Sequence, residues 1–185
     1  MSSAADVLSG VNLYFRLLLL TLRLRRAPRV SLWSQTRTPF RVWPTDLDPL
    51  LHMNNARYLG LMDLARTDLT VRSGYMQEVT RRGWYPVVGA QTITYKRSLK
   101  LWQRFVVTTR VLGFDERAAY MQQEFRRGGK LIARAVVQAR FLKRSGGTVS
   151  TAELLEASGD APADIELPSW VADWAASVRI SSSES

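Results

Sequence analysis

The sequence predicts an α+β fold in which an antiparallel sheet curls around one buried helix. A segment from Asn54 or Asn55 to Ser73 carries apolar residues on more than one stripe, which indicates a helix enclosed by other structure. Four strand-like runs follow this helix, and the last of them alternates strictly between apolar and polar residues. Strands joined by short turns form an antiparallel meander, so we expect one sheet packed on one helix.

The length and the residue types bound what this fold can hold. With 185 residues, the chain has the size of one domain with short extensions. It has no cysteine and a single histidine, His52, which excludes disulfides, thiolate metal sites, cysteine nucleophiles and multi-histidine metal sites within one subunit. We therefore expect neither a metal nor a redox cofactor.

The chain is strongly basic. Its 26 Lys and Arg residues against 16 Asp and Glu residues give a formal net charge of +10, and arginine dominates the basic set. This balance suits nucleic acid, an anionic membrane surface or a phosphate-bearing ligand. No run of basic residues interleaved with aromatic residues is present, and no zinc-finger spacing, so we expect no nucleic-acid partner.

Residues 7–24 form an apolar stretch that one arginine interrupts and a basic cluster follows. The uninterrupted apolar run is far shorter than the ~20 residues of a membrane-spanning helix. A secretory signal would place its positive charges before the apolar part, and here they follow it. Two interpretations stay open. One is a helix lying at a membrane surface, with Leu and Phe in lipid and four arginines near anionic headgroups: Arg16, Arg23, Arg25 and Arg26. The other is a helix packed on its own domain or on a partner subunit.

The central elements follow in order. Residues 36–43 alternate enough to form a strand that leads into an aspartate-rich turn. Asn54 or Asn55 can cap the next helix, because a short amide side chain accepts a bond from an unpaired amide of the first turn. Gly74 supplies the usual stop. We expect this helix to be wrapped by the sheet that comes after it.

The four strand-like runs cover about residues 85–95, 105–113, 117–126 and 130–142. Gly128 and Gly129 indicate a hairpin between the last two, and residues 113–116 form a longer turn. The last run places apolar residues on one face, three of them alanines that let a backbone lie close to a helix: Leu131, Ala133, Ala135, Val137, Ala139 and Phe141. Its other face carries Arg134, Gln138 and Arg140.

Beyond the sheet, a short helix begins at Ser150 or Thr151 and reaches about Ala157. Residues 159–164 indicate a linker, and residues 168–174 a terminal helix whose tryptophans need a surface to pack on. Residues 181–185 are expected to fray. We divide the chain into an N-terminal apolar and basic segment (1–35), the main domain (36–145) and a C-terminal helical extension with a tail (146–185).

The turn before the central helix carries the candidate chemistry. Asp46 and Asp48 lie two residues apart, and His52 follows four residues after Asp48. Taken alone, each has a structural explanation, since aspartate before a helix offsets the helix dipole and Asp-Pro is an ordinary turn dipeptide. The residues that follow Asp48 favour a catalytic role over a purely structural one.

The stretch from Asp48 to Arg66 resembles the signature of the hotdog-fold thioesterases. That signature has an aspartate, a His-Val-Asn-Asn-like tetrad that is His-Met-Asn-Asn here, a tyrosine ten residues after the aspartate (Tyr58) and an acidic-x-Ala-Arg element (Asp63 to Arg66). The motif covers about residues 45–74 and the fold-level resemblance about 36–145. Within the family, the sequence resembles the 4-hydroxybenzoyl-CoA thioesterase-like branch and, inside that branch, the thioesterase-superfamily-member-6-like proteins.

The resemblance assigns roles residue by residue. Asp48 matches the catalytic aspartate, which attacks the thioester carbonyl or activates water. The backbone amide near Asn55 matches the group that polarises the thioester oxygen, and an amide at a helix N-terminus favours developing negative charge. His52 matches a histidine of plant acyl-carrier-protein thioesterases, but those enzymes have an asparagine where this chain has Leu50. Asn54 and Tyr58 are expected to bind substrate.

Other charged residues receive supporting roles. Asp63 and Arg66, three apart on one helical face, are expected to form a structural ion pair. A basic cluster near the end of the second strand run is expected either to receive coenzyme A phosphates or to be a solvated face. It consists of Arg97, Lys100 and Arg104.

These observations predict a cytoplasmic acyl-CoA thioesterase, with or without attachment to a membrane surface. The resemblance implies a homodimer or homotetramer, because sites in the family lie between subunits. Peripheral membrane contact would involve residues 11–26. Two alternatives stay open: a non-catalytic acyl-thioester-binding or scaffold protein with the same fold, and an enoyl-thioester hydratase or dehydratase.

Overall fold

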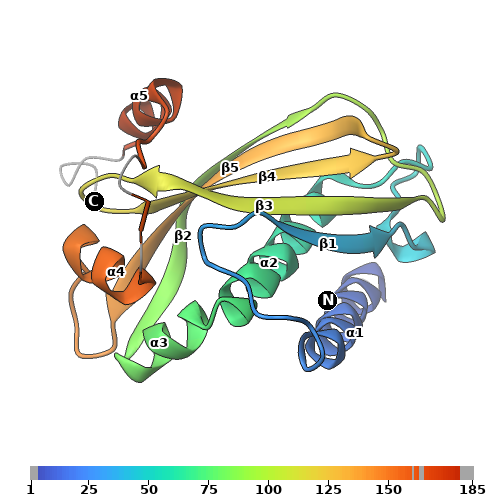
Figure 1. Cartoon of the computed structure of the whole chain (residues 1–185). Helices are drawn as coiled ribbons and strands as arrows, with labels where there is room; N and C mark the ends of the chain where they lie inside the picture. Colours follow the sequence, from blue (N-terminus) through green and yellow to red (C-terminus); the bar gives the residue numbers. More distant parts are fainter. Residues whose placement is uncertain (1–3, 160, 163–164, 180–185) are drawn as a thin grey trace.

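Five strands form one antiparallel sheet in a computed structural model that describes residues 4–159, 161–162 and 165–179, with side chains from Asn12 onward (Figure 1). The strand order is β1-β3-β4-β5-β2. The bounds are β1 Thr36–Arg41, β2 Trp84–Tyr95, β3 Arg104–Phe114, β4 Ala119–Arg127 and β5 Lys130–Lys143. Every strand predicted from the sequence is present within two residues of its expected limits. The two edge strands are therefore β1 and β2.

The hairpins form where turn residues predict them. Gly128 and Gly129 join β4 to β5 with φ angles of 52° and 76°, which glycine adopts without steric cost. Between β3 and β4, the Asp115 carboxylate accepts the backbone N–H groups of Arg117 and Ala118 at 2.7 and 2.8 Å. An aspartate that folds back on its own turn in this way fixes the connection.

Helix α2 (Asn55–Arg72) lies on the concave face of the sheet, as predicted. Asn54 caps it by accepting the Ala56 N–H at 2.9 Å, and the chain leaves the helix at Gly74, whose φ is 80°. Its buried side chains share one core with the inner face of the sheet: Tyr58, Leu61, Met62, Leu64 and Ala65 with Phe105, Val107, Phe125, Ala133, Ala135 and Val137. Ala133 and Ala135 are almost fully buried, so small side chains do allow the close approach of helix and strand.

A second helix follows where the sequence predicted only a stop. Gly74 adopts the left-handed conformation, and α3 (Tyr75–Arg81) begins directly after it. Tyr75 and Val79 pack with Trp84 and Phe141 in a second part of the core. The glycine therefore turns the helical path instead of ending it.

The C-terminal helices pack at the opposite end of the molecule from β1. Helix α4 (Thr151–Ser158) has a capping box, in which Ser150 and Glu153 satisfy each other's backbone amides. Helix α5 (Ser169–Ser177) covers the outer face of the sheet, where Val171 and Ala175 meet Leu112, Tyr120 and Val136. Part of the predicted linker 159–164 and the whole tail 181–185 lie outside the described residues.

Helix α1 (Ala4–Leu24) packs against its own domain, beside η1 (Pro44–Asp46) and α2. The described side chains that it buries are spaced four apart: Asn12, Arg16 and Leu20. The interpretation that placed Arg16 among lipid headgroups is therefore wrong, because a buried aspartate, Asp46, draws this arginine into the protein. Within the described residues, no helix is both long enough and apolar enough to cross a bilayer.

Candidate active site

A tight turn presents Asp48 just ahead of α2. The Asp48 N–H donates to the His52 carbonyl at 2.8 Å, and the Leu51 N–H donates to the Asp48 carbonyl at 3.0 Å. The carboxylate closes the turn with one oxygen, because Oδ1 accepts the N–H groups of Leu50 and His52 at 2.9 and 3.1 Å. Among the described residues, nothing donates to Oδ2, so the half-buried carboxylate keeps one oxygen for a ligand or water.

The first turn of α2 follows within seven residues of Asp48. The Asn54 N–H donates to the Asp46 carbonyl at 2.8 Å, and the neighbouring Met53 N–H donates to the Leu99 carbonyl at 2.8 Å. These bonds fix the residue at which the helix begins. The Asn55 N–H belongs to the first helical turn. Amides there have no acceptor inside the helix and form the positive end of the helix dipole. One short segment thus carries a carboxylate and an anion-stabilising amide.

Asp46 is the buried anchor of this segment. Its Oδ2 accepts Nη2 of Arg16 at 2.5 Å and the Trp43 N–H at 2.8 Å, while Oδ1 accepts the Asn12 side chain at 3.0 Å. Both side chains of the ion pair are more than nine-tenths buried. Burial lowers the pKa of Arg16, and the adjacent Asp46 counteracts that effect. Asp46 therefore has a structural role, and α1 is tied to the turn that carries Asp48.

Two tyrosines lie beside the helix start. Tyr58 is buried, with its ring centroid 4.9 Å from that of Tyr95 and 4.8 Å from that of Phe125. Burial raises the pKa of Tyr58 to about 12, so its hydroxyl stays protonated. The Tyr95 hydroxyl donates to the Asn55 carbonyl at 3.5 Å, and its ring is partly exposed. Tyr58 therefore packs against Tyr95. Tyr95 ends a predicted strand, but it was not among the predicted site residues.

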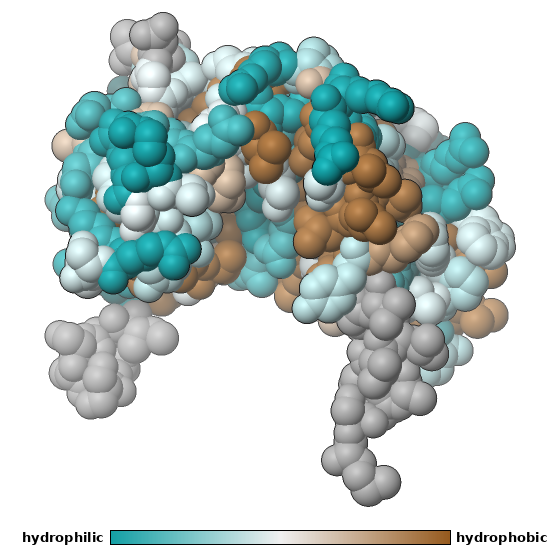
Figure 2. Space-filling model, turned by 90° about the horizontal axis from the view of Figure 1, so that it is seen from below, coloured by the Kyte–Doolittle hydropathy of each residue, from teal (hydrophilic) through white to brown (hydrophobic). Residues whose placement is uncertain are grey.

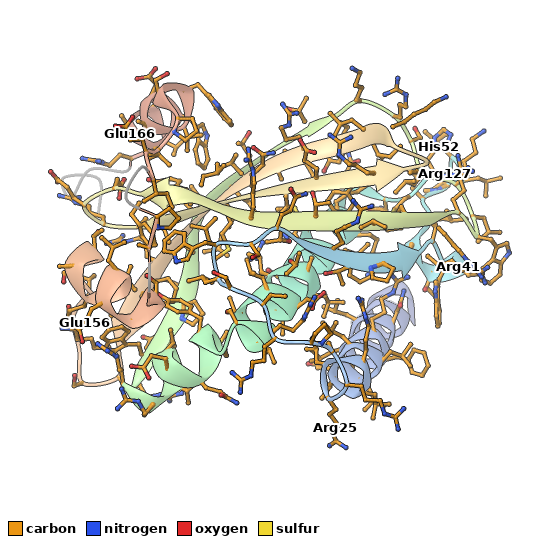
Figure 3. The ribbon with its side chains drawn as sticks, in the orientation of Figure 1. Arg25, Arg41, His52, Arg127, Glu156 and Glu166 are labelled. Atoms are coloured by element: carbon orange, nitrogen blue, oxygen red, sulfur yellow. The ribbon has the colours of Figure 1, made fainter. Side chains whose placement is uncertain are left out.

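Basic residues surround this end of the sheet. His52 and Lys100 pair as an isolated antiparallel bridge, which places the two turns side by side. Arg97 donates to the Leu131 carbonyl at 2.8 Å and, like Lys100, is exposed. Figure 3 shows His52, Arg41 and Arg127 toward one end of the molecule, while Glu156 and Glu166 lie toward the other end. Of the predicted residues, the structure therefore gathers Asp48, His52, Asn54, Asn55, Tyr58, Arg97 and Lys100 at one end of α2.

The predicted Asp63–Arg66 ion pair is present, and it borders an apolar cavity of about 200 Å³. Arg66 is largely buried and also donates to Gln123 at 2.9 Å, and burial lowers its pKa. The cavity lies between α2, α3, β2 and β5, and its apolar lining includes Val79, Val87, Val88, Met121 and Phe141. It does not include Asp48 or His52, so within one subunit it is separate from the candidate catalytic turn.

Metal ligands do not converge here. In the part of the chain that the structure describes, no three His, Asp or Glu side chains are grouped so that they could hold a metal ion.

Comparison with known proteins identifies relatives of this sequence. A sequence model of the thioesterase-like superfamily matches residues 42–175. Protein THEM6 of Xenopus laevis is 46% identical over 84 residues, which are 45% of this chain and 41% of that protein. Protein THEM6 of Drosophila melanogaster is 27% identical over 131 residues, which are 71% of this chain and 66% of that protein. The matched part thus spans less than half of the length of the vertebrate THEM6 proteins that resemble this chain.

Solved structures share the fold. YbaW, a probable thioesterase from Escherichia coli, has a TM-score of 0.62 at 24% identity, covering 67% of this chain and 98% of that one. A mutant 4-hydroxybenzoyl-CoA thioesterase complexed with 4-hydroxybenzoyl-CoA has a TM-score of 0.60 at 16% identity, covering 68% and 99%. The predicted hotdog fold and the resemblance to its thioesterases are confirmed.

Proposed function

Because this chain belongs to the thioesterase-like superfamily, we propose that it hydrolyses an acyl-CoA thioester to a free acid and coenzyme A. The observation that carries this proposal is the pairing of Asp48 with the first-turn amide of Asn55 on one hydrogen-bonded segment. A thioester carbonyl bound there would have a carboxylate available for attack and an N–H donor for its oxygen.

In the proposed reaction, Asp48 Oδ2 either takes a proton from a water that attacks the carbonyl carbon or attacks that carbon itself. The carbonyl oxygen becomes negatively charged and is stabilised by the Asn55 N–H with the α2 dipole behind it. The C–S bond then breaks, and the sulfur leaves as a thiolate that takes a proton. Along the direct path, water supplies the oxygen of the new acid. Along the nucleophilic path, the acyl group is left as a mixed anhydride with Asp48, and water hydrolyses it to release the acid and restore the carboxylate.

Coenzyme A carries several phosphate charges, and the proposed receptors are Arg97 and Lys100. Both are exposed on the segment that follows β2, beside the turn of His52. Arginine and lysine bind phosphate through charge-assisted hydrogen bonds. The proposed path of the pantetheine arm runs past Asn54, which caps α2, and Tyr95, whose hydroxyl donates to the Asn55 carbonyl.

We further propose a homodimer formed through β2. This strand is twelve residues long, is an edge of the sheet and exposes Tyr85 and Val88. A long open edge is a template for pairing with a second copy. Under two-fold symmetry, antiparallel pairing would bring the cavity beside Val88 of one subunit toward Tyr95 of its partner. The acyl group would then occupy a cavity of the neighbouring subunit.

The test is a panel of aromatic, short-chain and long-chain acyl-CoAs, with detection of the released thiol. Asp48→Asn should lower kcat by about 10²–10⁴-fold, since the amide cannot act as base or nucleophile. Its amide oxygen still accepts the bonds that close the turn, so the fold should persist. Asp173→Asn, at an exposed position on α5, is the matched control.

Turnover that Asp48→Asn leaves unchanged would refute the mechanism. If no substrate is cleaved but an acyl-CoA binds in calorimetry, the chain is a binding protein with this fold. Loss of the crotonyl-CoA double-bond absorbance without release of thiol would instead indicate hydration.

A further inference from the structure

Helix α1 is amphipathic with its polar residues turned inward. Asn12 and Arg16 are buried against Asp46, whereas seven large apolar side chains on the other sides of the helix are exposed by 39 to 76%: Leu13, Tyr14, Phe15, Leu17, Leu18, Leu19 and Leu22. Figure 2, seen from below, shows a brown apolar area on the lower side of the molecule, where α1 lies in Figure 1. An apolar face of this extent marks an interaction surface.

Two turns at the candidate site expose further apolar side chains. Leu51 and Trp102 have φ angles of 59° and 61°, and they are the only non-glycine residues of the described chain with positive φ. Leucine and tryptophan adopt this conformation at a cost of about 1–2 kcal/mol. The turns lie side by side through the His52–Lys100 bridge, and their tips expose four residues: Leu50, Leu51, Leu101 and Trp102.

Direct contacts join the helix face to these tips. The Phe15 and Trp43 rings lie 5.6 Å apart, and the Trp102 N–H donates to the carbonyl of Val42, the neighbour of Trp43. The Arg41 guanidinium lies over the Trp102 ring at 5.9 Å. The outward face of α1, Trp43 and the two tips therefore form one surface, which we call the apolar rim.

The charge around the apolar rim is predominantly positive, although Asp48 lies beside the tip at Leu50. Residues 7–45 contain seven arginines and no acidic residue, and residues 79–114 contain seven basic residues and no acidic one. Among these, Arg23, Arg25, Arg26, Arg41, Lys100 and Arg104 are exposed. The acidic residue that follows the first of these stretches, Asp46, is buried in its pair with Arg16. The apolar rim is therefore complementary to a partner that has an apolar interior and an anionic surface.

We infer that the apolar rim docks on an anionic lipid bilayer. The leucines of α1 and the tips at Leu51 and Trp102 enter the acyl region, and the arginines contact headgroups, as expected for interfacial helices. A second copy of this chain is a poorer occupant, because its rim would present the same uncompensated positive charge.

One consequence rests on the proposed function. The tips beside Asp48 would then lie at the lipid surface, so the thioester would reach the site from the bilayer. The substrate class would be a long-chain acyl-CoA, whose chain partitions into lipid, and not a freely soluble short-chain thioester.

Binding is tested by co-sedimentation of the full chain with vesicles of phosphatidylcholine alone and with vesicles containing phosphatidylserine. We expect binding to the second kind, weakened by high salt. Leu18→Glu should weaken it about ten-fold or more, because an exposed leucine is lost from the contact and a negative charge is added. The control, Val178→Glu, changes an exposed apolar residue at the C-cap of α5 and should leave binding intact. Point variants are preferable to deleting residues 1–27, because deletion would leave Asp46 buried without Arg16.

Insertion of the tip is tested with vesicles that contain a brominated lipid, which quenches nearby tryptophan. The bound wild type should show quenching that Trp102→Phe reduces and Trp170→Phe, on α5, does not. Equal binding to both vesicle types, unchanged binding of Leu18→Glu, or quenching that is insensitive to Trp102→Phe would overturn the inference. Loss of self-association in Leu18→Glu with vesicle binding unchanged would assign the rim to a second copy. None of these outcomes depends on catalysis, so failure of the proposed function is distinguishable.

Discussion

Asp46 and Asp48 are two residues apart and have opposite environments. Asp46 is almost completely buried and bonded on both oxygens, whereas Asp48 is half-buried and bonded on one. A carboxylate with a free oxygen at the surface can react with a substrate. A carboxylate whose oxygens are bonded to a buried arginine and to neighbouring groups is not available to one. The environment, and not the residue type, separates the two roles.

Substitution of Asp46 should therefore be much more costly to the fold than substitution of Asp48. Asp46→Asn leaves the Arg16 charge buried without a counter-ion, and we expect a loss of about 3–5 kcal/mol in the free energy of unfolding. Asp48→Asn should cost less than about 1 kcal/mol. Urea unfolding measures both. Equal small losses would show that Arg16 does not depend on Asp46, and the double variant Arg16→Met with Asp46→Leu should recover part of the loss.

At the scale of elements, regular structure could be predicted and the orientation of α1 could not. Alternation in β5 and the Asn54 and Gly74 signals depend on local backbone chemistry, which a sequence displays directly. Helix α1 is apolar nearly all round, so its periodicity does not show which side faces the protein. The residue that decides this, Asp46, lies 30 positions from Arg16.

The same distinction applies to the candidate site. Asp48 and Asn55 were predictable because both lie in the one segment that resembles the signature of the hotdog-fold thioesterases. Tyr95 was not, because it reaches Asn55 from a strand 40 residues away. The exposed tips were also missed, since a positive φ at Leu51 or Trp102 has no signature in residue type.

The cap of α4 should make stability depend on pH. The Lys143 ammonium, and then the amide and hydroxyl of Ser150, lower the pKa of Glu153 from 4.5 to about 2. Because the folded-state pKa is the lower one, the charged form stabilises the fold above about pH 4.5, and this contribution is lost as pH falls toward 2. Glu153→Gln should lower the Tm at pH 7 but not at pH 2. Glu166→Gln, at an exposed position, is the control, and an equal shift at both pH values would contradict the assignment.

Gly113 marks a close approach between β3 and the segment that leads to α5. A Cβ at this position would lie 3.1 Å from the Leu167 backbone nitrogen, whereas one at Gly128 meets no atom within 4 Å. Gly113→Ala should therefore destabilise the protein by about 1–3 kcal/mol more than Gly128→Ala. Chemical unfolding of the two variants measures the difference. Equal losses would mean that the segment at Leu167 moves aside without cost.

At the scale of the whole molecule, the β2 edge and the apolar rim lie on different elements and make separate predictions. If β2 pairs two subunits, light scattering of the wild type should give twice the 21.0 kDa of one chain. Val88→Arg would place like charges on both sides of the two-fold axis and should give the monomer mass. Val178→Arg, at the C-cap of α5, is the matched control. A monomeric wild type, or a dimer that Val88→Arg leaves intact, would refute β2 pairing.

The inward-facing Arg16 also has a consequence for synthesis. Helix α1 leaves the ribosome before the sheet does, with its leucines exposed, and Asp46 is made 30 residues after Arg16. At about 5–20 residues per second, the arginine waits roughly 2–6 seconds for its partner, and longer for the strands that enclose it. During that interval the nascent chain presents an unanchored apolar helix, which a chaperone or a membrane near the tunnel exit can engage before the domain does.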